Sequence, residues 1–201
     1  VAVDRGKLVL DPVVFGEYKR FAFTPDGVSP RVIPGVEGGM HLAPGSEHND
    51  GGVITENPKN RARMMEKRMQ KMISAGPDLP KANLFVKPGA RIGIIGYGSN
   101  SGPIAEAPDR LVKMGEPVNF LQLRTLWPFP DDDVKAFVEA NDHVFIVENS
   151  YTGQLGRLIR VVVGPIDKLH DVRKYNGRPF RPIEIIDAVR VTAGSRPMAG
   201  V

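Results

Sequence analysis

The chain has 201 residues, 41% hydrophobic and 25% charged, a balance that is typical of a folded globular protein and excludes a disordered one. Its formal charge of +4 is modest and its basic residues are mostly scattered, so nucleic-acid binding is not indicated, and no apolar run approaches the roughly 20 residues needed to span a membrane. The lack of cysteine excludes disulfides and cysteine-ligated metal centres within this sequence and favours a cytoplasmic protein.

The first part of the chain is dominated by turn signals. Residues 1–57 show little periodicity and contain dense clusters of proline and glycine, which predict loops and short irregular strands. We therefore expect residues 1–80 to form an irregular connector with one helix. The sequence opens at Val1 in a way that is typical of the interior of a longer chain, so we expect a fragment or a processed product.

A long helix is predicted over residues 58–75. Asn57 suits the N-cap, Pro58 the first helical position, and Gly76 the stop. One face is apolar, which indicates core or a subunit contact, and the opposite face is basic, which indicates either solvated surface or a dock for an acidic partner. The apolar face comprises Ala62, Met65, Met69, Met72 and Ile73, and the basic face Lys59, Arg61, Arg63, Lys67, Arg68 and Lys71.

From about residue 88 to residue 192, strand and helix patterns alternate, with a tail at 193–201. The expected strands are 91–95, 118–123, 143–147 and 166–172, and the expected helices include 103–114 and 183–191. Pro108 predicts a kink or a late start of the first of these helices. This alternation predicts an α/β domain with three layers around a mainly parallel sheet.

Two loops follow predicted parallel strands and so are expected at the carboxyl edge of the sheet, where open α/β folds bind ligands. The loop Gly96–Gly102 matches neither a Walker A nor a Rossmann glycine spacing. Its Ser99, Asn100 and Ser101 can face a ligand or partner. Alternatively, Asn100 or Ser101 caps the next helix. The second loop covers residues 148–153 and contains Asn149, and Gln154 follows it directly. These two side chains form hydrogen bonds either to a partner or within the loop itself.

A third candidate lies in the connector. Glu47, His48 and Asn49 stand together between glycines in a segment that is not predicted to be core. A loop histidine can donate a hydrogen bond to a carboxylate or change its charge near neutral pH, although many loop histidines are incidental. The residues by themselves show no catalytic triad and no metal-ligand spacing.

Several segments, taken in order along the chain, resemble the α subunit of 2-oxoacid:ferredoxin oxidoreductases, and the match is to the C-terminal third of such subunits. The segments are Arg20–Pro30, Gly45–Asn49, Gly96–Ala107, Leu123–Pro130, Val147–Leu155 and Asn176–Phe180. The resemblance implies that the last domain has the fold of the transketolase C-terminal domain and that residues 1–80 are the connector before it.

The resemblance also implies a function. Members of this family decarboxylate a 2-oxoacid on thiamine diphosphate with Mg²⁺, pass electrons through [4Fe-4S] clusters to ferredoxin, and form an acyl-coenzyme A. The resemblance implies that other domains and the β subunit hold these cofactors, so we expect no catalytic residue in this chain. The connector most resembles that of the 2-oxoglutarate enzymes, with pyruvate and branched-chain 2-oxoacids as the other possibilities.

On this basis we expect the connector candidates Glu47, His48 and Asn49 to lie near the substrate. We expect the loop candidates to contact another subunit or coenzyme A; they are Ser99, Asn100, Ser101, Asn149 and Gln154. Three alternatives stay open at this point. The chain could be a free-standing nucleotide- or coenzyme A-binding module, a purely structural assembly domain, or the C-terminal domain of another thiamine enzyme.

Overall fold

The computed structural model describes residues 3–192, and the tail predicted at 193–201 lies outside them. The chain divides into two compact units: unit 1 runs to Leu79 and unit 2 starts at Pro80. Each unit is described by itself. Among the described residues, no helix combines the length and the apolar character needed to cross a membrane.

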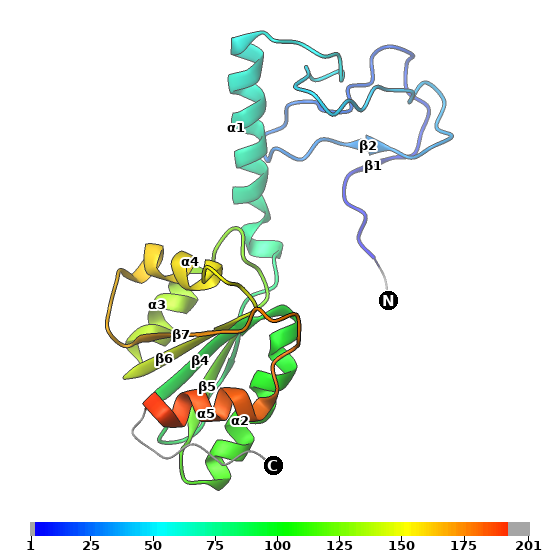
Figure 1. Cartoon of the computed structure of the whole chain (residues 1–201). Coiled ribbons are helices and arrows are strands. Elements are labelled where there is room, and N and C mark those ends of the chain that lie inside the picture. The colour runs from blue at the N-terminus through cyan, green and yellow to red at the C-terminus, as the bar shows by residue number, and fades with distance from the viewer. Residues whose placement is uncertain (1–2, 193–201) are drawn as a thin grey trace. The chain divides into compact units, whose positions relative to one another are not determined.

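Unit 1 consists mainly of irregular loops, as its proline and glycine content predicts. Its strands β1 (Leu8–Val9) and β2 (Arg31–Val32) form one short parallel pair. Its helix α1 (Pro58–Ala75) is followed by the 3-10 turn η1 (Gly76–Asp78), and Figure 1 shows the loops before α1 in blue and cyan.

The start of α1 confirms the predicted cap. The Asn57 side-chain oxygen accepts hydrogen bonds from the backbone N–H groups of Lys59 and Asn60, at 2.9 and 3.1 Å, and Pro58 occupies the first helical position. These contacts satisfy two of the donors that every helix leaves unpaired at its N-terminus.

Of the alternatives expected for the two faces of α1, the structure contradicts one. The predicted apolar face does not form a core, because Met65, Met69 and Ile73 are exposed and the one buried residue of the helix is Met64. The basic face is largely solvated, as expected, since Lys59, Arg61, Arg63 and Lys71 are exposed. Two of its residues have a further role, because Arg61 and Arg68 donate to the carboxylate of Glu47 in the connector. Charged hydrogen bonds to a loop orient this helix, because the connector offers little apolar surface to pack against.

One glycine shows how closely a loop approaches this face. Gly27 has a φ of +73°, and a Cβ at this position would lie 2.5 Å from both the carbonyl oxygen of Lys67 and the backbone nitrogen of Lys71. Any other side chain would collide with the helix backbone, so this contact requires glycine.

Unit 2 is a five-stranded sheet in the order β3-β5-β4-β6-β7. The three central strands and β7 are parallel, and β3 pairs antiparallel with β5 at one edge. The strands are β3 (Asn83–Phe85), β4 (Ile92–Tyr97), β5 (Val118–Leu123), β6 (His143–Glu148) and β7 (Leu169–Arg173).

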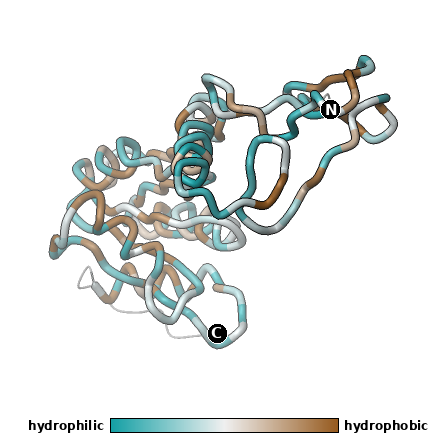
Figure 2. The backbone as a smooth tube through the Cα atoms, turned by 90° about the horizontal axis from the view of Figure 1, so that it is seen from above, coloured by the Kyte–Doolittle hydropathy of each residue, from teal (hydrophilic) through white to brown (hydrophobic). Residues whose placement is uncertain are grey.

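Helices cover both faces of this sheet, which confirms the predicted three-layer α/β architecture (Figure 1). One apolar cluster joins the sheet to α2 and α5, and a second joins it to α3 and α4. Figure 2 shows hydrophobic segments throughout unit 2, whereas the coil of α1 is largely hydrophilic. The helices are α2 (Ser101–Lys113), α3 (Asp131–Glu139), α4 (Gln154–Val163) and α5 (Pro182–Thr192), with the 3-10 turn η2 (Gly98–Asn100) before α2.

Four details of unit 2 differ from the sequence prediction. The edge strand β3 was not predicted, because three residues are too few to show a period. The strand expected at 166–172 begins later, as β7 at Leu169–Arg173. The late start expected from Pro108 is wrong, since α2 begins at Ser101 and continues through this proline. Val112, whose apolar character and helical spacing predict the inner face of α2, is 43% exposed. Pro108 removes only one helical hydrogen bond, and the fully buried Ile104 and Leu111 hold α2 on the sheet at either side.

Candidate binding site at the carboxyl edge of the sheet

A cavity of about 460 Å³ lies where loops follow the carboxyl ends of β4, β6 and β7. Ser99 enters from the turn after β4, Asn149 from the loop after β6, and the remaining residues from the segment between β7 and α5. We call this the edge cavity, and it is lined by Ser99, Asn149, Lys174, Tyr175, Gly177, Arg178 and Pro179.

Local backbone chemistry shapes this cavity. Gly177 has a φ of +77°, and the neighbouring Asn176 accepts a hydrogen bond from the backbone N–H of Arg178 at 3.1 Å, which forms a tight turn. Asn149 donates its side-chain amide to the carbonyl oxygen of Lys174 at 3.2 Å, which ties the loop after β6 to the end of β7. Two of the three loops that build the cavity are therefore bonded to each other.

The edge cavity contains two cations, Lys174 and Arg178, and only Lys174 is paired with a carboxylate. The Lys174 ammonium donates to both carboxylate oxygens of Glu184 at 2.8 Å and to the carbonyl of Pro179 at 2.9 Å. Burial acts to raise the pKa of Glu184, but the hydrogen bonds from Lys174 and from the N–H of Arg181 outweigh it and lower that pKa. Lys174 is thus neutralised within the fold, whereas the Arg178 guanidinium makes no hydrogen bond or ion pair with any described residue.

These groups can hold an anionic or strongly polar group. A free guanidinium binds phosphate or carboxylate through paired N–H donors, and the Ser99 hydroxyl and Asn149 amide can add hydrogen bonds. Among the lining residues there is no histidine or carboxylate to activate a nucleophile. The edge cavity is therefore a candidate binding site.

The structure brings together only two of the five residues predicted in these loops, Ser99 and Asn149. Asn100 occupies the N-cap position of α2, as one alternative predicts, but neither its side chain nor that of Ser101 makes a capping hydrogen bond. Asn100 is buried in a helical conformation within η2, with no capping hydrogen bond, and the Ser101 hydroxyl is buried without a partner. Gln154 begins α4, where its backbone N–H donates to the Ser150 hydroxyl at 3.2 Å.

Sequence reasoning missed the third loop, which supplies Lys174, Tyr175 and Arg178. From the sequence alone, Asn176 and Gly177 predict a turn and no binding group. The available signal was the position of this turn directly after a parallel strand, which places it at the same sheet edge as the other two loops.

A buried carboxylate beside these loops was missed as well. Glu148 is fully buried at the end of β6, and its two carboxylate oxygens accept the backbone N–H groups of Leu155 and Gly156 at 3.0 and 2.9 Å. This arrangement places a negative charge at the N-terminus of α4, where the helix dipole favours it. Glu148 fixes the loop that carries Asn149.

The connector candidates Glu47, His48 and Asn49 stabilise their own loop. The His48 ring is buried, lies 4.0 Å from the Phe21 ring between centroids, and its Nδ1 is 2.9 Å from the carbonyl oxygen of Asn49. The Asn49 side-chain oxygen accepts from the backbone N–H groups of Gly51 and Val53, each at 3.0 Å.

Glu47 links this loop to α1. Its carboxylate accepts hydrogen bonds from Arg68 at 2.6 and 3.1 Å and from Arg61. The hydrogen bonds from Arg68, and then those from Arg61, lower the pKa of Glu47 from its usual 4.5 to about 2. The group therefore stays ionised over the whole physiological range.

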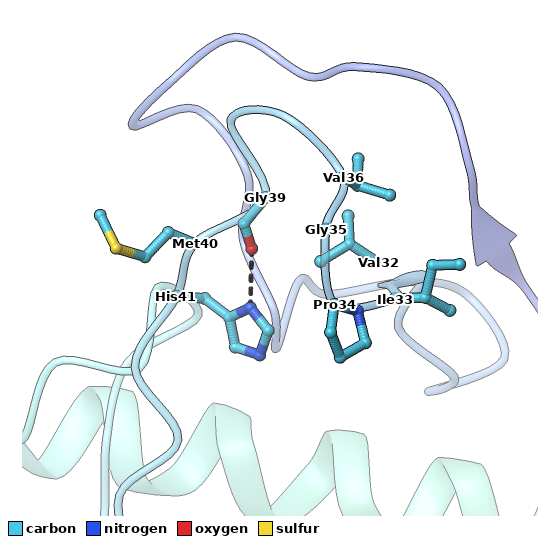
Figure 3. A pocket seen from close by; sticks show the side chains of 8 residues that line it. All are labelled: Val32, Ile33, Pro34, Gly35, Val36, Gly39, Met40 and His41. Atoms are coloured by element: carbon cyan, nitrogen blue, oxygen red, sulfur yellow. Dashed lines mark hydrogen bonds between the residues drawn. The ribbon is translucent and has the colours of Figure 1, made fainter.

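Unit 1 also contains a cavity of about 350 Å³ around residues 32–41 (Figure 3). His41 lies at its rim, with Nδ1 2.9 Å from the carbonyl oxygen of Gly39, and the other lining side chains are apolar. No charged residue lines it, so its chemistry favours apolar contact rather than binding of a charged ligand.

Comparison with known proteins relates both units to the same enzyme family. The family model for pyruvate:ferredoxin oxidoreductase core domain II matches residues 90–185. The 2-oxoacid:ferredoxin oxidoreductase subunit alpha of Saccharolobus solfataricus is 31% identical over 193 residues, which cover 94% of this chain and 30% of that protein. A more distant relative, the 2-oxoglutarate synthase subunit KorA of Methanothermobacter thermautotrophicus, is 25% identical over 86% of this chain and 46% of its own length.

A solved structure extends this result to the fold. The 2-oxoglutarate:ferredoxin oxidoreductase from Magnetococcus marinus, with 2-oxoglutarate, coenzyme A and succinyl-CoA bound, aligns with a TM-score of 0.74 and 33% identity. The alignment covers 88% of this chain and 31% of that chain, so the sequence spans about a third of this relative. The chain belongs to the α subunits of the 2-oxoacid:ferredoxin oxidoreductase family.

Proposed function

We propose that this chain is part of an enzyme that converts a 2-oxoacid and coenzyme A to acyl-coenzyme A and CO₂. The two electrons released when the carboxyl carbon leaves reduce two ferredoxins, and the coenzyme A thiol forms the new thioester bond. The observation that carries this proposal is similarity at 31–33% identity across both units. We favour 2-oxoglutarate, because the related enzyme from Magnetococcus marinus binds it.

Within this enzyme we assign the chain a structural and binding role, with the β subunit as its direct partner. Thiamine diphosphate, Mg²⁺ and [4Fe-4S] clusters belong elsewhere in the proposed enzyme, because the residues present here do not fit them. The sequence contains no cysteine for a cluster. In residues 3–192 no three histidine, aspartate or glutamate side chains are grouped as metal ligands.

We also propose that the edge cavity holds a phosphate group of coenzyme A. The free guanidinium of Arg178 supplies the charge, and the Ser99 hydroxyl and the Asn149 amide supply further hydrogen bonds. Asn100, Ser101 and Gln154 then support the loops around it. In unit 1, Glu47, His48 and Asn49 are proposed to shape the approach to the 2-oxoacid.

The substitution Arg178→Ala in the assembled enzyme tests this assignment. The KM for coenzyme A should rise about five- to tenfold, as expected for loss of one charged hydrogen bond, while the KM for the 2-oxoacid stays unchanged. Thioester formation and ferredoxin reduction would be measured with 2-oxoglutarate, pyruvate and a branched-chain 2-oxoacid in turn. Arg157→Ala, an exposed arginine on α4, is the matched control.

Three outcomes would change the proposal. Weaker subunit assembly with an unchanged KM for coenzyme A would assign Arg178 to a protein contact. Micromolar binding of ATP or coenzyme A by the 201-residue chain alone would favour a free-standing binding module. No turnover of any 2-oxoacid by the assembled enzyme would contradict the proposed activity itself.

A further inference from the structure

Two exposed tyrosines lie at the edge cavity. Tyr175 lines the cavity and is 64% exposed, and Tyr151, in the loop after β6, is 70% exposed. Their rings meet edge to face, with centroids 4.9 Å apart and an angle of 80° between the ring planes. An edge-to-face contact occupies at most one face of either ring. Tyr175 therefore presents an open aromatic face at the cavity.

The backbone on both sides of this tyrosine pair is held by hydrogen bonds. The Arg173 guanidinium donates to the carbonyl oxygen of Tyr151 at 2.8 Å, which ties the loop after β6 to the end of β7. Lys174, the residue before Tyr175, donates to both carboxylate oxygens of Glu184 at 2.8 Å. A flat ligand that stacks on Tyr175 thus meets a surface that is already ordered, which lowers the entropic cost of binding.

The edge cavity offers two kinds of recognition at once. Arg178 lies on the far side of the turn at Gly177 and lines the same cavity as Tyr175. An open aromatic face binds a flat conjugated ring, and an unpaired guanidinium binds phosphate through parallel N–H donors. One ligand that uses both groups carries a heterocycle and a phosphate, which is the chemistry of a nucleotide. The cavity volume of about 460 Å³ falls within the roughly 300–1,000 Å³ of small-molecule sites.

We propose that the edge cavity is a nucleotide site, in which Tyr175 stacks on the adenine ring of coenzyme A while Arg178 binds a phosphate of the same molecule. Tyr151 supports the Tyr175 ring from its side. This inference rests on the proposed function, which supplies the ligand and assigns no residue to its base. The cavity then recognises the adenosine end of coenzyme A, the end that takes no part in the formation of the thioester.

A protein contact fits this arrangement less well. Tyrosine and arginine are also frequent at protein interfaces. Here, however, both residues line a concave site together with the hydroxyl of Ser99 and the amide of Asn149, and not a flat apolar patch. Trp127 gives the contrast, because it is 63% exposed in the loop after β5 and lines no part of the cavity.

Substitutions at Tyr175 in the assembled enzyme test the stacking. Tyr175→Ala should raise the KM for coenzyme A about tenfold, since loss of an aromatic platform weakens base binding by about this factor. Tyr175→Phe keeps the ring and should leave that KM within about twofold. Trp127→Ala is the matched control and should leave it unchanged. The melting curve of Tyr175→Ala should match that of the unsubstituted enzyme, because the side chain is mostly exposed.

Fragments of coenzyme A separate the base from the rest of the molecule. Phosphopantetheine carries the thiol and a phosphate but lacks adenosine, so Tyr175→Ala should leave its KM as a thiol substrate unchanged. Adenosine 3′,5′-bisphosphate lacks the thiol and should inhibit competitively against coenzyme A. Tyr175→Ala should raise its inhibition constant about tenfold, the same factor as for the KM of coenzyme A.

Each contrary result overturns the stacking. An equal rise in KM for coenzyme A and phosphopantetheine would show that Tyr175 acts on another part of the molecule. A rise as large in Tyr175→Phe would assign the effect to the hydroxyl, and weaker subunit assembly with an unchanged KM would assign the ring to a protein contact. If Arg178→Ala raises the KM for coenzyme A and Tyr175→Ala does not, only the stacking fails. If neither does so while a 2-oxoacid is turned over, the phosphate assignment fails as well.

Discussion

Units 1 and 2 are held together by different forces. Unit 2 has two clusters of fully buried aliphatic and aromatic side chains, one on each face of its sheet. In the described part of unit 1, only Val32 and Met64 are buried hydrophobic residues, and polar contacts such as those of Glu47 with Arg61 and Arg68 connect the loops to α1. Apolar burial is insensitive to pH and salt, whereas charged contacts depend on both, so the two units should respond differently to the same conditions.

The largest effect is expected from the core of unit 2. Ile94 is completely buried in the central strand β4, so Ile94→Ala should lower the free energy of unfolding by about 2–5 kcal/mol. Urea unfolding monitored by circular dichroism would measure this loss. Hydrogen exchange by mass spectrometry would then show faster exchange in peptides of unit 2 only.

Val161→Ala is the control for this substitution, because it removes a similar amount of apolar side chain from a position that is 84% exposed. If both variants unfold at the same urea concentration, the buried cluster does not stabilise unit 2, and the contrast between the units would have to be abandoned.

A smaller effect is expected from Glu47 in unit 1, and it should depend on pH. The folded state lowers the pKa of Glu47 from 4.5 to about 2, mainly through Arg68 and then Arg61. Its stabilising contribution is therefore complete above pH 4.5 and is lost as the pH falls from 4.5 towards 2. The protection of residues 20–75 against hydrogen exchange, relative to intrinsic exchange at each pH, should fall over this interval and at a higher pH than the protection of unit 2.

Glu47→Gln is the matched variant, since it keeps the size of the side chain and removes its charge. It should exchange faster than the natural chain at pH 7 and show a weaker dependence between pH 4.5 and pH 2. Asp26, whose pKa is also about 2 because Lys7 and the backbone of Val28 bind it, remains in both chains and cancels in the difference. Identical profiles for the two chains would show that Glu47 does not fasten the connector.

The smallest effect is expected from an ion pair in unit 2. Arg91 and Asp142 form two hydrogen bonds at 2.7 and 2.9 Å, and hydrogen bonding from Arg91 lowers the pKa of Asp142. Both side chains are more than half exposed, where such pairs contribute little. Arg91→Ala should therefore leave the urea midpoint of unit 2 unchanged, and a clear decrease would show that charged contacts stabilise this unit as well.

How well the fold could be predicted from the sequence also differs between regions of the chain. In unit 2 the longer strands and helices, such as β5 and α5, could be predicted because the spacing of their apolar residues reflects burial directly. The edge strand β3 could not, since its three residues are fixed by pairing with β5, which is 35 or more positions away. The edge cavity was predicted only in part. Ser99 and Asn149 lie in loops whose polar and glycine-containing sequences mark them as candidates, whereas Arg178 follows an Asn-Gly turn of a common type.

The sequence by itself determined the α/β alternation, the cap and bounds of α1, and the resemblance to an enzyme family. These properties depend on local spacing, or on motifs read in order along the chain. Only the tertiary structure decided that the methionines of α1 are exposed and that Arg61 and Arg68 bind Glu47. The pattern of α1 shows two distinct faces, but which face is covered depends on what the loops of unit 1 offer. The connector presents the carboxylate of Glu47 and little apolar surface, so it binds two arginines of the helix and leaves the methionines exposed.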